Sequence, residues 1–207
     1  MVNQERIRRD IVTIGASAGG VEAVGQLLSQ LPADLPAAVA IVIHRSPVFE
    51  SRLPFVLSRC AKMEVVEPAD GDPFVATRAY TAPRDQHLLV EDGVVRLSHG
   101  PKEHRTRPAI DPLFRSAAVA FGPRVVGVLL TGFGDDGVPG FIDIKKAGGL
   151  TLVQDPREAQ HPTMPRTAIA EDDVDAVLPI DGLAKAIVAL AAGEAIEHTG
   201  PHEPVRP

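Results

Sequence analysis

The chain has 207 residues, which is enough for one sizeable domain and short for two. Its net charge of −6 argues against a broad nucleic-acid-binding face, and no stretch approaches the roughly 20 apolar residues that cross a bilayer. We therefore expect neither nucleic-acid binding nor direct membrane insertion. The single cysteine, Cys60, excludes an intrachain disulfide and fits a reducing, cytoplasmic location.

The first predicted strand, Ile11–Ile14, runs into a serine flanked by small residues, in the sequence Gly-Ala-Ser-Ala-Gly-Gly at 15–20. This G-x-S-x-G pattern is the nucleophile elbow of serine hydrolases, in which the chain turns sharply and exposes the serine hydroxyl. Free N–H groups at the start of the following helix would face negative charge that develops beside Ser17. The same glycines also imitate the phosphate-binding turn of dinucleotide-binding folds, so this motif alone leaves both interpretations open.

Two further polar side chains follow predicted strands. The apolar run Val39–Ile43 ends at His44, and the run Val125–Leu130 leads into a loop that carries Asp135 and Asp136. Ligand and catalytic groups of open α/β sheets gather at the edge where parallel strands end. A serine, a histidine and an aspartate at that edge favour nucleophilic hydrolysis. A nucleotide site would instead place an acidic residue where His44 ends the second strand.

The alternation of strands and helices predicts an α/β fold with a doubly wound, mainly parallel sheet and helices on both faces. One helix follows Ser17, a second begins at Asp111 as N-cap and stops at Gly122, and Asp181 caps a third over Gly182–Ala192. The remaining buried strands are predicted at Met63–Val66, Leu150–Val153 and Asp175–Ile180.

The region from Ala79 to Ser98 departs from this alternation. Short strands are predicted at Ala79–Ala82, His87–Val90 and Val94–Leu97, and Glu-Asp-Gly at 91–93 is a hairpin signal between the last two. Strands so closely spaced pair antiparallel, because a parallel pair needs a longer crossover. We therefore expect an antiparallel hairpin at one edge of the parallel sheet.

The three candidate residues occur in the order Ser, His, Asp, whereas α/β-hydrolases run Ser, Asp or Glu, then His. Triad geometry recurs on unrelated folds in different orders, so the chain is not an ordinary α/β-hydrolase. We expect the Ser17 hydroxyl near Nε2 of His44, with Asp136 on the other ring nitrogen. The other histidines lack metal-ligand spacing and are expected on the surface or in packing roles, and no metal or other cofactor is predicted. They are His87, His99, His104, His161, His198 and His202.

Taken in order, the motifs of the chain resemble the catalytic domain of CheB-type protein-glutamate methylesterases. The matching segments, which span about residues 10–190, are Gly-Ala-Ser-Ala-Gly-Gly at 15–20, Ile-His at 43–44, Asp-Gly-Asp-Pro at 70–73, Ala-Pro-Arg-Asp-Gln-His-Leu-Leu at 82–89, Arg-Pro-Ala-Ile-Asp-Pro-Leu-Phe-Arg-Ser-Ala-Ala at 107–118, Leu-Thr-Gly-Phe-Gly-Asp-Asp-Gly at 130–137, Ala-Gly-Gly at 147–149, Gln-Asp at 154–155 and Met-Pro-Arg at 164–166.

This resemblance implies a role for each matching site residue. It puts the nucleophile at Ser17, the general base at His44 and the carboxylate that orients the histidine at Asp136. It puts oxyanion and substrate-binding groups at Ala18, Gly19, Phe133 and Met164. Phe133 stands where the family often has methionine, whose backbone N–H helps to hold the oxyanion, and a backbone donor survives that exchange. Asp135, which precedes the triad position, is not the expected triad member.

The resemblance implies a serine hydrolase that removes methyl esters from glutamyl side chains, converting protein glutamate methyl ester and water into protein glutamate and methanol. The same acyl-transfer machinery could deamidate glutamine. The implied partner is a methylated chemoreceptor or chemoreceptor-like protein in a cytoplasmic chemotaxis phosphorelay. The alternative is a catalytically inactive signalling or binding domain of the same fold.

Family members in chemotaxis usually carry an N-terminal receiver domain. A receiver needs on the order of 100 residues, whereas only about ten precede the first predicted strand. We therefore expect an N-terminal extension at 1–10, a free-standing catalytic domain at 11–192 and a disordered tail at 193–207. Activity would then be constitutive or controlled by a separate response-regulator partner.

Overall fold

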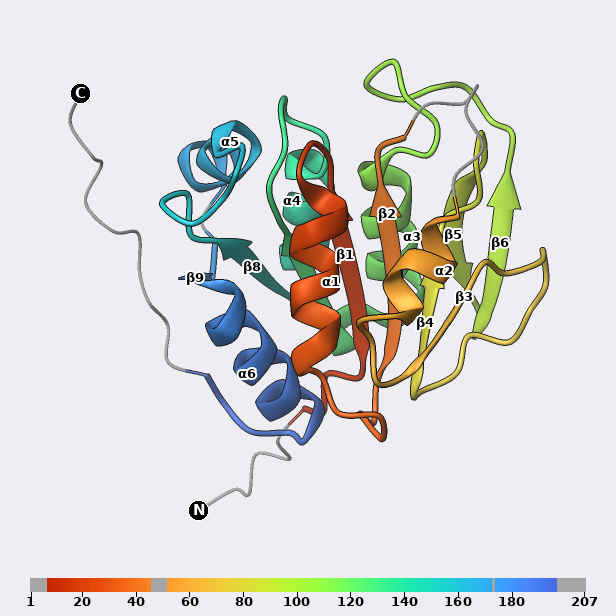
Figure 1. The fold of residues 1–207 in the computed structure, drawn as a ribbon, viewed down its shortest axis with the longest axis horizontal. Coiled ribbons are helices and arrows are strands. Elements are labelled where there is room, and N and C mark those ends of the chain that lie inside the picture. The colour runs from red at the N-terminus through yellow and green to blue at the C-terminus, as the bar shows by residue number, and fades with distance from the viewer. Residues whose placement is uncertain (1–6, 46–51, 173, 197–207) are drawn as a thin grey trace.

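The protein was analysed as a computed structural model, which describes residues 7–45, 52–172 and 174–196. Seven strands form one sheet in the order β3-β4-β2-β1-β7-β8-β9, and every neighbouring pair is parallel (Figure 1). They are β1 (Ile11–Ala16), β2 (Ala38–Ile43), β3 (Glu64–Val66), β4 (Arg78–Thr81), β7 (Val125–Leu129), β8 (Leu150–Gln154) and β9 (Ala176–Leu178). The strand order reverses between β1 and β7, the place where open α/β sheets bind ligands.

Helices cover both faces of this sheet. On one face lie α1 (Gly20–Gln30), α6 (Ile180–Ala191) and the short α2 (Leu53–Ser58). On the other lie α3 (Ile110–Phe121), α4 (Val138–Lys146) and α5 (Thr163–Glu171), and a short 3-10 helix, η1 (Gly122–Arg124), follows α3. The predicted fold class, a doubly wound α/β domain, is confirmed.

The central strands are buried on both sides, which explains their largely apolar sequences. Along β2, Val39 and Ile41 join the core beneath α1 and α6, whereas Ala40 and Val42 join the core beneath α3 and α4. Because side chains alternate across a strand, one apolar run supplies both cores. The two cores hold the carboxyl ends of β1, β2 and β7 at one edge.

The region from Ala79 to Ser98 differs from the expectation in two ways. The first of its short strands, β4, does not join the hairpin but pairs parallel with β2 and β3. The hairpin strands, β5 (His87–Glu91) and β6 (Val94–Ser98), form a separate antiparallel sheet that packs on α3. The connection at 67–77 returns the chain to the start of β4, where the Tyr80 hydroxyl holds it by donating to Pro73 O at 2.7 Å.

Two helices start before their predicted caps, since Asp111 and Asp181 lie inside the first turns of α3 and α6. The first N–H groups of these helices donate instead to carboxylates from distant loops, Asp136 for α3 and Glu158 for α6. A cap supplied by a distant residue leaves no local signal in the sequence. The sequence therefore predicts the nearest aspartate as the cap of each helix, and this prediction is wrong for both helices. Gly122 follows the last residue of α3, as predicted.

Both described ends of the chain contact α6. The N–H of Arg9 donates to Leu190 O at 3.0 Å, and the N–H of Glu194 donates to Ala189 O at 2.8 Å. Ile196, in the segment predicted as a tail, packs against the core. The rest of that tail, with His198 and His202, lies outside the described residues.

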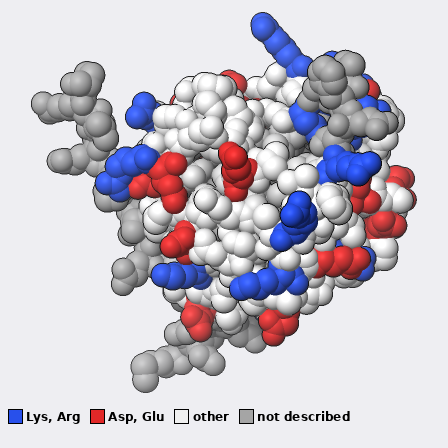
Figure 2. All heavy atoms as spheres, viewed as in Figure 1, with Lys and Arg blue, Asp and Glu red and all other residues white. Residues whose placement is uncertain are grey.

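Among the helices of the described residues, none combines the length and the hydropathy that crossing a membrane requires. On the face shown in Figure 2, acidic and basic side chains are interspersed. This face therefore carries no broad field of one sign that would attract a polyanion.

Candidate active site

Ser17 is the first residue after β1, and close packing fixes the turn that it occupies. Its N–H donates to Thr131 O at 3.0 Å, which ties the turn to the end of β7. A Cβ built on Gly132 would lie 2.7 Å from the Ser17 Cβ, so only glycine fits there. Gly19 has a φ of +74°, a left-handed conformation that favours glycine. The turn leaves Ser17 partly exposed at the sheet edge.

His44 is the first residue after β2, beside Ser17. The register pairs Ala16 with Ile43, and the His44 N–H donates to Ala16 O at 3.0 Å. The Ser17 hydroxyl donates to Nδ1 of His44, at an Oγ–Nδ1 distance of 3.2 Å. The expectation that Nε2 makes this contact is therefore wrong. Ser17 lies on the neighbouring strand near the His44 backbone, and Nδ1 is the ring nitrogen closer to the backbone.

Asp136 reaches the site from the loop between β7 and α4. Nε2 of His44 donates to its Oδ2 at 2.6 Å. The same Oδ2 accepts the N–H of Ile110 at 2.8 Å, and Oδ1 accepts the N–H of Asp111 at 2.9 Å. The carboxylate is 2% exposed and occupies the N-terminus of α3, where the helix dipole favours negative charge. One side chain thus caps a helix and orients a histidine.

The surroundings of Asp136 keep its carboxyl ionised at neutral pH. Burial alone would raise its pKa, but the hydrogen bond from His44 and those from two backbone N–H groups of α3 hold the pKa below its ordinary value. The arrangement suits a histidine that takes up a proton from Ser17 during a reaction.

Asp111, the residue predicted as the cap of α3, holds the loop of Asp136 instead. Its Oδ1 accepts the N–H of Gly137 at 3.0 Å and that of Gly140 at 2.8 Å. A Cβ at Gly140 would lie 3.0 Å from this Oδ1, so the helix backbone approaches closely. Asp111 therefore joins the start of α3 to the start of α4.

Three backbone N–H groups on Ser17's own turn and on the adjoining loop could serve the site. Within the described residues, the N–H groups of Ala18, Gly19 and Phe133 donate no hydrogen bond. Ala18 and Gly19 precede α1, and Phe133 lies on the adjoining loop after β7. Donors in such positions can stabilise an oxyanion beside the serine.

The side chains of Phe133 and Met164 differ in their exposure to solvent. The Phe133 ring is 57% exposed and lies against His161, with ring centroids 4.6 Å apart. Met164 has no exposed surface, and its Cε would lie 2.6 Å from a Cβ at Gly132. A direct contact of Met164 with substrate, which we expected, does not fit this burial. Its side chain supports the turn at Gly132 from beneath.

Thr131 connects the loops of the site, and sequence reasoning did not single it out. It is buried, and its hydroxyl donates to Ala18 O at 3.0 Å and accepts the His161 N–H at 2.8 Å. Its own N–H donates to Oε1 of Gln154 at 2.9 Å. A threonine at the end of a buried strand is a weak signal, because its partners come from three other segments.

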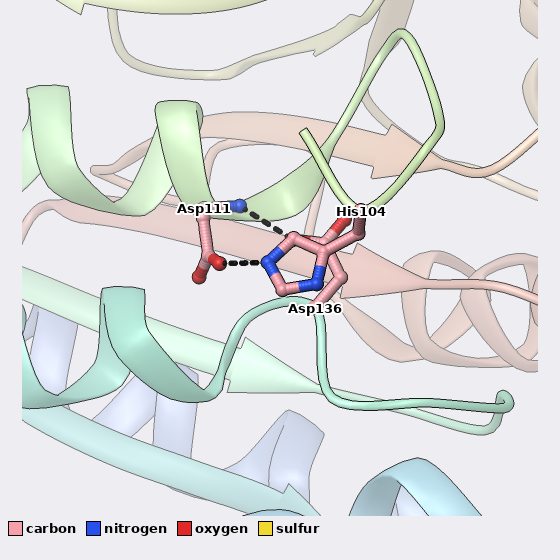
Figure 3. A group of neighbouring side chains, drawn as sticks. All are labelled: His104, Asp111 and Asp136. Atoms are coloured by element: carbon pink, nitrogen blue, oxygen red, sulfur yellow. Dashed lines mark hydrogen bonds and ion pairs between the residues drawn. The ribbon is translucent and has the colours of Figure 1, made fainter. Parts of the chain in front are cut away.

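His104 is a second histidine of the site that the sequence did not reveal. Its Nε2 lies 2.7 Å from Oδ2 of Asp111, and its Nδ1 lies 3.2 Å from Oδ1 of Asp135 (Figure 3). Asp135 is 64% exposed and contacts His104, whereas His44 contacts Asp136. Single ligand atoms of His104, Asp111 and Asp136 lie within 4.8 Å of one another, as in a small metal site. Protein hydrogen bonds already engage both carboxylates, so this geometry is accounted for without an ion.

Comparison with known proteins identifies the family. A family model described as CheB methylesterase matches residues 12–187. The chain is 43% identical over 180 residues to protein-glutamate methylesterase/protein-glutamine glutaminase 2 of Anaeromyxobacter dehalogenans, covering 87% of this chain and 53% of that protein. It is 38% identical over 184 residues to the protein of the same activities from Pyrococcus horikoshii, covering 87% and 50%.

A solved structure shares the fold. The catalytic domain of Thermotoga maritima CheB methylesterase superposes with a TM-score of 0.83 at 31% identity, covering 87% of this chain and 98% of that one. The chain spans about half the length of the curated relatives it matches. The family model covers Ser17, His44 and Asp136, and the chain belongs to the CheB methylesterase family.

Proposed function

We propose that the chain hydrolyses methyl esters of glutamyl side chains in methylated chemoreceptor-type proteins, with Ser17 as nucleophile, His44 as general base and Asp136 as the residue that orients His44. The observation that carries the proposal is the continuous hydrogen-bonded series from Ser17 through His44 to Asp136, beside backbone N–H groups that have no partner among the described residues. Membership of the family supports it.

In the first half of the proposed reaction, the Ser17 Oγ attacks the ester carbonyl carbon while Nδ1 of His44 takes the hydroxyl proton. Asp136 stabilises the resulting imidazolium through Nε2. The tetrahedral intermediate collapses, the bond to the methoxy oxygen breaks, and that oxygen takes the proton from Nδ1. Methanol leaves, and a glutamyl ester of Ser17 remains.

In the second half, a water molecule replaces methanol. His44 takes a proton from the water, the hydroxide oxygen attacks the acyl carbon, and the Ser17 oxygen leaves with the proton from Nδ1. The products are a glutamate side chain and the unmodified enzyme. The N–H groups of Ala18, Gly19 and Phe133 would stabilise both oxyanions, and one such donor contributes about 2.7–4 kcal/mol in enzymes of this type.

A second candidate activity is glutamine deamidation. Two relatives from Anaeromyxobacter dehalogenans that match the chain carry names that include protein-glutamine glutaminase. An amide differs from the ester only in its leaving group. Nδ1 of His44 would protonate the leaving amide nitrogen, which departs as ammonia, as it would protonate the methoxy oxygen of the ester. The same three residues would therefore serve both substrates.

We further propose residues 11–192 as the catalytic unit and the cytoplasm as its location. The single cysteine supports a reducing compartment. The partner would be the methylated segment of a chemoreceptor or chemoreceptor-like protein, and a separate response regulator could control access to Ser17. The partly exposed Ser17 is compatible with a macromolecular substrate.

The proposal is tested with the purified 207-residue chain and a receptor-derived helical peptide that carries a γ-methyl glutamate. We expect release of methanol, detected enzymatically, and formation of one glutamate per methanol by mass spectrometry. A fluorophosphonate should label Ser17 and block the reaction.

Ser29→Ala is the matched control, since Ser29 is an α1 residue whose hydroxyl donates to Gln26 O away from the site. This variant should keep full activity and full labelling, whereas Ser17→Ala should lose both. A chain that binds the peptide yet releases no methanol and takes up no fluorophosphonate would be a binding domain, contrary to the proposal.

A further inference from the structure

His104 stands in the loop before α3 with a φ of +48°, so its backbone adopts a left-handed conformation. The side chain is 27% exposed and points toward the start of α3 (Figure 3). Both ring nitrogens face carboxylates, Asp111 at 2.7 Å and Asp135 at 3.2 Å, and Oδ1 of Asp136 lies 3.9 Å from Nε2. No step of the proposed reaction uses this histidine.

Carboxylates accept hydrogen bonds, and a neutral imidazole has only one N–H to donate. For His104 to donate a hydrogen bond to each carboxylate, both of its ring nitrogens must carry a proton. The doubly protonated ring meets this requirement. The charged groups that face the ring are Asp111 on α3 and Asp135 and Asp136 on the loop after β7. On its own loop, the neighbouring Glu103 is neutralised by Arg115 at 2.8 Å.

The residues that His104 joins are those that hold the triad carboxylate. Asp111 fixes the loop through the N–H groups of Gly137 and Gly140, and its own N–H donates to Asp136. Asp135 is the neighbour of Asp136 in the chain. His104 thus connects the start of α3 to the loop from the solvent side, where Asp135 is 64% exposed.

We propose that His104 is a positioning residue of this site: its protonated ring joins Asp111 to Asp135 and so holds Asp136 against His44, and the hold weakens when the ring loses its proton. This inference rests on the proposed catalytic roles of Ser17, His44 and Asp136. It adds a residue that acts on the triad through the loop and does not touch the reacting atoms.

The direction of titration agrees with the geometry. Burial lowers the pKa of His104, but the charges of Asp136 and Asp111 outweigh burial and raise the pKa above the ordinary 6.5. Burial and the charge of Asp136 also raise the pKa of Asp111. The pair therefore retains a proton at a pH where an isolated histidine would lose it. The connection that protonated His104 makes between Asp111 and Asp135 is complete below pH 6.5, and it is lost as the pH rises through the raised pKa of His104.

The test measures the rate at which a fluorophosphonate labels Ser17 between pH 5 and pH 10, a readout that needs no receptor substrate. The unchanged chain should label more slowly in alkali, where His104 loses its proton, than at pH 6.5. His104→Asn keeps a residue type that tolerates a left-handed backbone. This variant should label about tenfold more slowly than the unchanged chain at pH 6.5. Displacing a catalytic group by about 1 Å can slow a reaction by more than this. The labelling rate of the variant should show no alkaline decline.

Two further variants separate positioning from a general structural role. His104→Arg supplies two donors at every pH, so it should recover most of the rate and show no alkaline decline. Asp135→Asn removes one charge that raises the His104 pKa, so its alkaline decline should begin at lower pH. Because Asp135 is mostly exposed, this variant tests the inference even if His104→Asn fails to fold. His99→Asn, at an exposed histidine that contacts Gln86, is the control and should match the unchanged chain.

The inference is overturned if the unchanged chain shows no alkaline decline, or if His104→Asn keeps both the rate and the decline of the unchanged chain. If Ser17 of the unchanged chain takes up no label at any pH, the catalytic assignment fails and the positioning role fails with it. Normal labelling without methanol release would contradict only the proposed substrate.

Discussion

Ser17 and His44 reach the site by a different route from Asp136. The first two residues follow directly on neighbouring strands, and the register of β1 with β2 brings them together. Asp136 stands in a loop beyond β7, and two N–H groups of α3 hold its carboxylate. The ends of β1 and β2 would keep their geometry without the reacting side chains. The loop after β7 depends on its own Asp136 side chain, which ties the loop to α3. A substitution at Ser17 should therefore change activity with little effect on stability, whereas a substitution at Asp136 should change both.

The largest expected effect lies on the strand side. Ser17→Ala and His44→Ala should each lower ester hydrolysis by about 10⁶-fold, and the double variant should be scarcely worse, because members of a triad act as a unit. Ser17→Ala removes no buried contact of the sheet, so its free energy of unfolding in urea should stay within about 0.5 kcal/mol of the unchanged chain. His44→Ala also removes the hydrogen bond to the buried Asp136 carboxylate, so it should be less stable than Ser17→Ala. Losses that multiply in the double variant would contradict the pairing of Ser17 with His44.

Asp136→Asn should affect both activity and stability. We expect hydrolysis to fall by about 10⁴-fold, because an amide cannot hold the protonated ring of His44 as a carboxylate does. The free energy of unfolding should fall by about 1.5–3 kcal/mol, since hydrogen bonds to a charged acceptor at the start of α3 are weakened. Urea titration of this variant beside Ser17→Ala measures the difference. Equal stability of the two variants would show that the cap of α3 does not depend on the charge.

The smallest expected effect is at the contact between strand β1 and the start of helix α3. A Cβ at Gly15 of β1 would lie 2.4 Å from Cγ2 of Ile110, the first residue of α3. Gly15→Ala should therefore push the start of α3 away from Asp136 and lower the free energy of unfolding by about 1–3 kcal/mol.

Gly25→Ala is the control for this substitution. A Cβ at Gly25, inside α1, would meet the Cys60 sulfur at an ordinary 3.6 Å. This change should leave stability equal or increase it by up to about 1 kcal/mol, because alanine favours helix over glycine. Thermal unfolding of both variants distinguishes overpacking from the general effect of losing a glycine.

The same comparison explains what the sequence could predict. Strands β2 and β7 are continuous apolar runs, and β1 and β8 are mostly apolar, so their existence and the edge at which Ser17 and His44 lie followed from the pattern. The position of β4 did not follow, because a short strand beside a hairpin signal is indistinguishable from a member of the hairpin. Pairing with β2 was decided by tertiary contacts such as those of Tyr80.

The carboxylate network was the part that the sequence concealed. Asp111 was predicted to cap its own helix, but Asp136 does so from 25 residues away, which frees Asp111 to hold Gly137 and Gly140. His104 belongs to this network and lies in a polar loop with no periodic pattern. The ring orientation of His44 was equally hidden, since it depends on which neighbour approaches the backbone side of the imidazole.

The cap that Asp136 supplies to α3 has an evolutionary consequence. In a descendant that no longer needed to hydrolyse esters, a change at Ser17 would be nearly free of cost to folding, whereas a change at Asp136 would expose the helix start that it covers. Selection for a folded domain alone would therefore retain the aspartate after the serine had drifted. Among lineages that lost the reaction, Asp136 should be the last of the three residues to disappear, and its presence alone would be a poor marker of activity.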